Sequence, residues 1–216
     1  MNIPQTRRVA AAKFDLFVLT FAALAIFAGC SHKPAVKEAP EKMAGSTDFY
    51  IPGFDDNPDS EKIYPSYLSF VDGLHVTGTP IEVDIEKYRL TIKGNIKKPS
   101  QFTYDDIKAM DAETIEIKLV CPGFFEDIGE WTGVKLSKLL EQLDVNDDAS
   151  SVVFNAIDGN YSKILPMEKV MNTNVLIAYE FDGEPFAVYH GFPLRVAVED
   201  ECGAFWVKWL GSIVVR

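Results

Sequence analysis

The sequence predicts a single α+β domain over residues 63–216, with a mixed sheet and a few short helices. Segments in which apolar and polar residues alternate, as they do in half-buried strands, recur along this part of the chain. Only short segments with a helical period lie between them, and the sequence contains no internal repeat. A chain of 216 residues has room for about one such domain, so a single site carries whatever chemistry the protein performs.

The elements follow from their local patterns. Strands are predicted at residues 88–93, 115–119, 151–156, 175–181, 194–198 and 206–215. Short helices are predicted at 103–110, where Thr103 and Asp106 form a capping box, at 136–143, where leucines recur at helical spacing, and at 166–171. Asp-Gly pairs predict turns at 158–161 and 182–185. Cys121 therefore lies at or just past the end of a strand.

The first 29 residues have the pattern of an export signal. Three basic residues precede residues 16–28, an uncharged and mostly apolar run that is shorter than the roughly 20 residues needed to span a bilayer. The run ends in Phe27-Ala28-Gly29-Cys30, which resembles the cleavage box of a lipoprotein and predicts lipidation of Cys30. A retained anchor helix is the alternative. Either interpretation places the domain outside the cytoplasm, attached to a membrane on the periplasmic or cell-surface side.

Residues 30–62 predict a flexible tether between this anchor and the domain. They are rich in Pro, Ala, Gly and charged residues and have no apolar period. The chain thus divides into a signal peptide of lipoprotein type (1–29), a tether (30–62) and a domain (63–216). Because an exported domain meets an oxidising compartment, a disulfide between Cys121 and Cys202 is one possible use of the two remaining cysteines.

Composition and missing motifs exclude several classes of function. The chain has 32 acidic and 21 basic residues and a formal net charge of −11, which argues against a protein that binds nucleic acid through its phosphates. With three histidines, one of them in the tether, a histidine-rich zinc site is excluded. The sequence also lacks Gly-x-Ser-x-Gly, Gly-x-Gly-x-x-Gly and Walker-type motifs, so the common hydrolase and nucleotide-binding sites are absent.

Three short segments carry the candidate chemistry. Cys121 precedes a Pro-Gly turn, where packing does not require sulfur, although a buried or disulfide-bonded cysteine fits the same pattern. His190 and Arg195 flank a Gly-Pro turn that opens a strand, which suits an anionic ligand held by charge-assisted hydrogen bonds, although ordinary loops share this pattern. Lys208 lies between two tryptophans, where the alternative is a solvent-facing lysine on an edge strand.

Taken in order, these segments resemble the molybdopterin-binding domain of the sulfite oxidase family. The resemblance runs from about Leu74 to Val215. It rests on LHVTGTP at 74–80, YRLTIKG at 88–94, LVC at 119–121, WTGVKL at 131–136, DGNY at 158–161, HGFPLR at 190–195 and VKWL at 207–210. The resemblance implies the sulfite-oxidase-type mixed-sheet fold as a single domain and a molybdenum-molybdopterin cofactor.

The resemblance also implies a role for each candidate residue. Cys121 would be the catalytic thiolate ligand of molybdenum, since a soft thiolate suits this metal. His190, Arg195 and Lys208 correspond to positions that hold the pterin and its phosphate. The metal-bearing cofactor would act on a small-molecule substrate. Since no second redox centre fits in the chain, we expect a separate electron-transfer partner.

Departures from the family pattern leave two hypotheses open. Phe205 stands where an arginine that binds phosphate is common, and residues 199–201 are three carboxylates that would repel a phosphate if they pointed toward it. Lys118 is the one basic residue close to Cys121 in sequence. The first hypothesis is a membrane-tethered extracytoplasmic molybdenum-cofactor oxidoreductase of unknown substrate. The second is a cofactor-free relative that acts as a ligand-binding or assembly lipoprotein, with Cys121 inert or bonded to Cys202.

Overall fold

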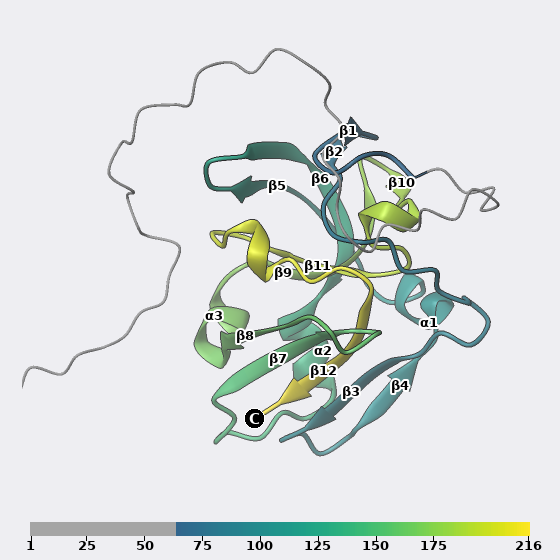
Figure 1. Ribbon diagram of the computed structural model, residues 1–216. Coiled ribbons are helices and arrows are strands. Elements are labelled where there is room, and N and C mark those ends of the chain that lie inside the picture. Colours follow the sequence, from purple (N-terminus) through teal and green to yellow (C-terminus); the bar gives the residue numbers. More distant parts are fainter. Residues whose placement is uncertain (1–63) are drawn as a thin grey trace, which may run out of the picture. The chain divides into compact units, whose positions relative to one another are not determined.

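The computed structural model describes residues 64–216. The predicted export signal, the lipidated Cys30 and the tether lie outside the described residues. Within residues 64–216, no helix is both long enough and apolar enough to cross a membrane. The strands of the described domain form two five-stranded sheets and a two-stranded ribbon (Figure 1). The predicted α+β class with a mixed sheet is confirmed, although the strands divide between two sheets.

The first sheet lies in the lower half of Figure 1 and has the order β4-β3-β12-β7-β8. Its strands are β3 (Leu90–Gly94), β4 (Ser100–Phe102), β7 (Ser151–Ala156), β8 (Ser162–Pro166) and β12 (Leu210–Val215). The sheet is mixed because β12 runs parallel to β3 and antiparallel to β7.

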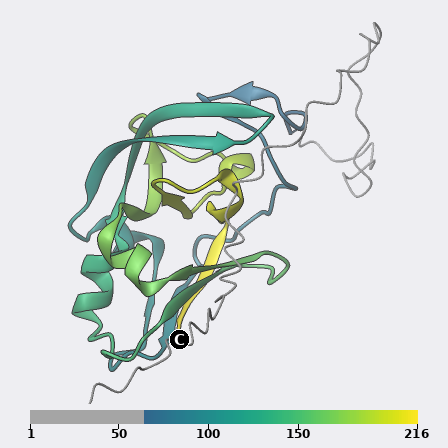
Figure 2. The same ribbon diagram turned by 90° about the vertical axis from the view of Figure 1, so that its left-hand side faces the viewer.

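The second sheet is antiparallel and has the order β10-β9-β6-β5, with β11 also paired to β9. Its strands are β5 (Glu113–Cys121), β6 (Phe125–Lys135), β9 (Val175–Phe181), β10 (Glu184–Pro185) and β11 (Arg195–Val198). Strands β5 and β6 form the long hairpin at the top of Figure 2. The site residues Cys121 and Arg195 both belong to this sheet.

The hairpin turn that follows Cys121 is encoded locally. Pro122 and Gly123 occupy the two central positions, and Gly123 has a φ of 83°, a conformation that L side chains rarely adopt. The Phe124 N–H donates to the Cys121 carbonyl at 3.0 Å, which closes the turn. Proline followed by a glycine with positive φ is the signature of a type II turn, so the Pro-Gly pair fixes Cys121 as the last residue of β5.

A two-stranded ribbon formed by β1 (Phe70–Val71) and β2 (Leu74–His75) precedes both sheets. Asp72 and Gly73 connect its strands, and both have positive φ values, 53° and 78°. An Asp-Gly pair is the preferred sequence for such a tight hairpin turn. The ribbon brings His75 against the β5–β6 hairpin, as the site below shows.

The helices are short and cover the sheets. They are α1 (Tyr104–Lys108), α2 (Leu136–Gln142) and α3 (Met167–Asn172), together with the 3₁₀ turns η1 (Val188–His190) and η2 (Gly203–Phe205). The predicted capping box at α1 is confirmed, since Thr103 accepts from the Asp106 N–H while the Asp106 carboxylate accepts from the Thr103 N–H.

The core is apolar and centres on Trp131 of β6, whose side chain is fully buried. Its ring meets Phe181 and Trp206 edge to face, at centroid distances of 4.7 and 4.9 Å. Its Nε1–H donates to the Ile117 carbonyl at 3.0 Å, so the one polar atom of the ring is satisfied. Trp131 thereby joins β5, β9 and the segment that carries Lys208.

Two expectations are corrected. The strand predicted over 206–215 begins only at Leu210, because Trp209 has a φ of 50°, outside the extended region. Lys208 therefore precedes the strand, and the alternative of a solvent-facing lysine on an edge strand is wrong because only 9% of Lys208 is exposed. Strand β6 was not predicted, since glycine and acidic residues interrupt its apolar alternation.

Candidate active site

Cys121 carries a free thiol at the end of β5. It lies opposite Phe125 in the hairpin and is half-buried. The segment that contains Cys202 runs beside it through a parallel bridge between Val120 and Cys202. A side-chain carbon at Gly203 would lie 3.9 Å from the Cys121 Cβ. Because Cys121 is nevertheless unbonded, the predicted alternative of a Cys121–Cys202 disulfide is wrong.

A buried carboxylate lies on the same face of the hairpin as Cys121. Asp127 is two residues from Phe125 on β6, so both side chains point to one side of the sheet. Asp127 is only 2% exposed. Burial and the negative charge of Asp127 raise the pKa of the Cys121 thiol. A metal ion bound to the sulfur would oppose this effect and keep the thiol deprotonated.

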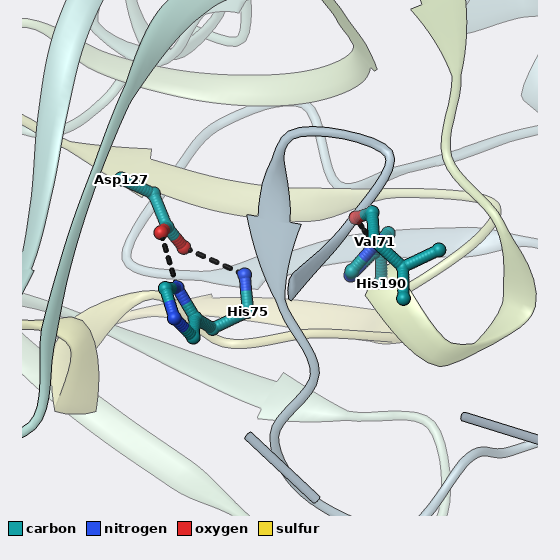
Figure 3. A network of polar contacts seen from close by, with 4 residues as sticks. All are labelled: Val71, His75, Asp127 and His190. Atoms are coloured by element: carbon teal, nitrogen blue, oxygen red, sulfur yellow. Dashed lines mark hydrogen bonds and ion pairs between the residues drawn. The ribbon is translucent and has the colours of Figure 1, made fainter. Parts of the chain in front are cut away.

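His75 of the ribbon holds both oxygens of Asp127 (Figure 3). The His75 Nδ1–H donates to Asp127 Oδ1 at 2.5 Å, and the His75 backbone N–H donates to Oδ2 at 2.8 Å. The His75 ring also stacks on the Phe125 ring, with centroids 4.3 Å apart. The buried carboxylate is thus satisfied, and the ribbon is fastened beside Cys121.

Arg195 is buried at the start of β11. One of its NH groups donates to the His190 carbonyl at 3.0 Å, and its guanidinium lies over the Trp131 ring at 5.0 Å. Burial lowers the pKa of Arg195 to about 9, and the charge of Asp127 partly opposes this shift. No carboxylate within residues 64–216 pairs with Arg195 directly, so its charge is compensated only at a distance.

His190 is buried and neutral. Burial lowers the pKa of His190 to about 4, and the positive charges of Arg195 and Lys208 act in the same direction. Its Nε2 lies 2.8 Å from the Val71 carbonyl (Figure 3), and since a carbonyl only accepts, Nε2 carries the proton. The other ring nitrogen, Nδ1, is an acceptor with no partner among the described residues.

Lys208 is the second buried cation, beside Arg195. Its Nζ donates to the Thr77 carbonyl and, at 3.0 Å, to the Tyr189 carbonyl. Burial, together with the charge of Arg195, lowers the pKa of Lys208 well below its usual value. A buried cation held by carbonyls and not by a carboxylate is costly in isolation, which favours an anionic ligand at this place.

Charge interactions connect the four predicted site residues through Asp127 and Arg195. Asp127 acts on both Cys121 and Arg195, and Arg195 acts on His190 and Lys208. Sequence reasoning missed Asp127, the residue that connects the group. Its signal was a polar residue at a position where the neighbouring members of the alternation, Phe125 and Trp131, face inward.

The three carboxylates at residues 199–201 form no ion pair with Arg195 or Lys208. Glu199 accepts a hydrogen bond from the Asn174 side-chain amide at 2.8 Å, and Glu201 pairs with Lys169 at 3.3 Å. Asp200 is exposed. These partners lie in and just after α3. The contacts of Glu199 and Glu201 are therefore made away from the basic residues that would hold a phosphate.

Residues 76–216 match the model of the family described as the oxidoreductase molybdopterin binding domain. The chain belongs to this family. It is therefore an oxidoreductase of the molybdopterin-dependent class, and the predicted cofactor type and fold are confirmed.

Among individual relatives, the chain is similar to the uncharacterized oxidoreductase YuiH of Bacillus subtilis, at 29% identity over 143 residues, 65% of this chain and 71% of that protein. It is 29% identical to the sulfite oxidase of Arabidopsis thaliana over 200 residues, 75% of this chain and 51% of that enzyme. The sulfane dehydrogenase SoxCD from Paracoccus pantotrophus has a similar structure, with a TM-score of 0.59 and 22% identity, over 82% of this chain and 56% of that one. The chain thus spans about half the length of the last two.

The site has the features that such a cofactor needs. Two buried polar atoms, His190 Nδ1 and Arg195 Nε, have no hydrogen-bond partner among residues 64–216. Unsatisfied buried polar atoms in a native structure call for an explanation, and an absent ligand is one. An anionic ligand that offers both donors and acceptors would satisfy both atoms, so the residues present fit the pterin group with its phosphate.

Proposed function

We propose that this chain is an exported, membrane-tethered molybdenum-cofactor oxidoreductase in which Cys121 ligates the metal. The observation that carries the proposal is the combination of a free thiol with two buried cationic side chains, Arg195 and Lys208, that have no carboxylate partner within residues 64–216. A purely structural arrangement would leave the desolvation of Arg195 and Lys208 uncompensated. A bound anionic cofactor compensates it.

Each residue then has a defined task. Cys121 supplies the thiolate, while Arg195 and Lys208 supply fixed positive charge for the phosphate, and His190 accepts a hydrogen bond at Nδ1. When bound, the cofactor supplies two-electron oxygen-atom chemistry. Asp127, held by His75, balances the positive charges and keeps the ribbon in place over the hairpin.

The proposed location rests on the pattern of the first 62 residues of the sequence. Cleavage before Cys30 and lipidation of its thiol would attach the domain to a membrane through the tether at 30–62. The enzyme would act on a small molecule outside the cytoplasm and exchange electrons with a separate partner. A partner is needed because two electrons enter or leave the site in each turnover.

The substitution Cys121→Ser tests the metal ligand. Serine has nearly the same size as cysteine, but its oxygen is a poor ligand for this metal, so bound molybdenum and activity should be lost together. The thermal midpoint of the apoprotein should stay within about 2 °C of wild type, since a half-buried thiol contributes little to packing. Metal analysis and thermal unfolding of the same preparation check this. Full molybdenum content in the variant would contradict the assignment.

The substitution Cys30→Ser tests the anchor. Without its acyl acceptor the protein should leave the membrane fraction or remain unprocessed, since a polar tether has no other affinity for lipid. Membrane fractionation and the mass of the purified chain distinguish these outcomes. A variant that stays on the membrane with residues 1–29 removed would refute lipidation of Cys30.

A further inference from the structure

Aromatic rings form a row beside the Cys121 thiol. Phe125 lies opposite Cys121 in the hairpin. The His75 ring stacks on Phe125 at 4.3 Å, and the Phe70 ring packs against His75 at a centroid distance of 5.1 Å. Phe70 is 63% exposed, so the row runs from the half-buried end of β5 outward to solvent. Phe124, in the turn next to Cys121, is 70% exposed.

This row is rigid where it meets the site. Two hydrogen bonds from His75 to the buried Asp127 fix both the backbone and the ring of the histidine (Figure 3). The β1–β2 ribbon that carries Phe70 is fixed in addition by the hydrogen bonds of Val71 to His190 and of Asp72 to Tyr189. A preformed aromatic surface binds an apolar group without the entropic cost of ordering side chains.

The charges near Cys121 are unfavourable for an anionic substrate. Asp127 is the acidic residue that lies on the same face of the hairpin end as Cys121. Lys118, the basic residue closest to Cys121 along β5, lies on the opposite face, where it pairs with Glu126 at 3.1 Å. Arg195 and Lys208 are buried, and in the proposed function they hold the phosphate of the cofactor, so they do not serve a second anion. An oxyanion beside Cys121 would meet negative charge that no free cation on the hairpin offsets.

We propose that the substrate is a neutral organic molecule whose aromatic or alkyl arm lies along the row Phe70, His75 and Phe125, and not an inorganic oxyanion. This inference rests on the proposed function, because it places the reacting atom at the metal held by Cys121. Stacking of a substrate ring against an aromatic side chain strengthens binding beyond the contribution of the area it buries. The contribution of Phe70 is therefore measurable as a difference between substrates with and without a ring.

The experiment uses the full-length holoenzyme made in a host that synthesises the cofactor. Four probes are compared: methyl phenyl sulfoxide, dimethyl sulfoxide, nitrate and sulfite. Reduction of a sulfoxide breaks its S–O bond, and the oxygen leaves as water after taking up two protons. The two electrons come from two molecules of a reduced viologen dye. Nitrate is assayed with the same donor, and sulfite oxidation with ferricyanide as acceptor.

We expect kcat/KM for methyl phenyl sulfoxide to exceed that for nitrate and for sulfite by at least about tenfold, since the negative charge of Asp127 repels the anions. Phe70→Ala should lower kcat/KM for methyl phenyl sulfoxide by about three- to tenfold and change that for dimethyl sulfoxide by less than about twofold. Ile164→Ala is the matched control, because Ile164 is a similarly exposed apolar residue on β8, outside the row. It should change neither value.

The outcomes separate the two levels of the proposal. A protein without molybdenum contradicts the proposed function itself. A molybdenum-loaded protein that processes sulfite or nitrate as well as the sulfoxides overturns the substrate inference, as does one that reduces neither sulfoxide. Equal losses on both sulfoxides in Phe70→Ala also overturn it, since they would indicate a structural effect.

Discussion

The two large sheets of the domain bury different kinds of side chain. In the sheet β4-β3-β12-β7-β8 the fully buried residues are apolar, namely Leu90, Ile92, Val152, Phe154, Leu165, Leu210 and Ile213. In and next to the sheet of β5, β6 and β9 the buried residues include Asp127, His190, Arg195 and Lys208. Because buried charge costs free energy unless a partner compensates it, the first sheet buries side chains that serve stability alone, whereas the second combines the apolar core around Trp131 with a group suited to a ligand.

The largest effect on stability is expected in the apolar sheet. Phe154 is fully buried on β7. Phe154→Ala should lower the free energy of unfolding by about 3–5 kcal/mol, because it removes buried surface and leaves a cavity. Ile164→Ala, on the exposed face of the adjacent β8, should change it by less than about 0.5 kcal/mol. Urea unfolding of the apoproteins measures both, and similar values for the two variants would refute the placement of Phe154 in the apolar core of this sheet.

A smaller effect on stability, with a large effect on the ligand, is expected at Arg195. Arg195→Met keeps the apolar stem beside Trp131 and removes the buried charge. Since Asp127 remains paired with His75, the free energy of unfolding of the apoprotein should change by less than about 2 kcal/mol. Cofactor retention during gel filtration should fall at least about tenfold. A variant that is as destabilised as Phe154→Ala and still retains cofactor would show that Arg195 serves stability and not the ligand.

The smallest effect concerns the pH dependence of stability. The pKa of His190 falls from its usual value near 6.5 to about 4 in the folded apoprotein. Between these values the unfolded chain binds the proton and the folded chain does not, so stability decreases as pH falls from about 6.5 toward 4. His190→Gln, which cannot titrate, should lose less stability over that interval. Parallel pH profiles for wild type and variant, from urea unfolding, would contradict a neutral buried histidine.

Much of the fold follows from local sequence. The strands at 151–156 and 175–181 have the predicted bounds, and the capping box of α1 forms as expected. Each depends on residues close together in the chain. Strand β6 was not predicted because its register is set by pairing with β5 and β9. This pairing tolerates acidic residues on the exposed face and glycines that contact Phe181 or β9.

The candidate site was predictable in part. Cys121, His190, Arg195 and Lys208 follow from the family resemblance. In the structure Arg195 and Lys208 donate to the carbonyls of His190 and Tyr189, and Asp127 acts on both Cys121 and Arg195. The pair of His75 and Asp127 did not follow, because 52 residues separate its members and neither carries a motif. The burial of Lys208 also depends on tertiary contacts, since its partner carbonyls belong to Thr77 and Tyr189.

The central claim is that the coupled group around Cys121 holds a molybdenum-pterin cofactor. The most direct test is the amount of molybdenum and of pterin per chain in full-length protein purified from a host that makes the cofactor. We expect about one of each per chain, released together on denaturation. Folded protein that contains neither, from a host in which another molybdenum enzyme is fully loaded, would contradict it.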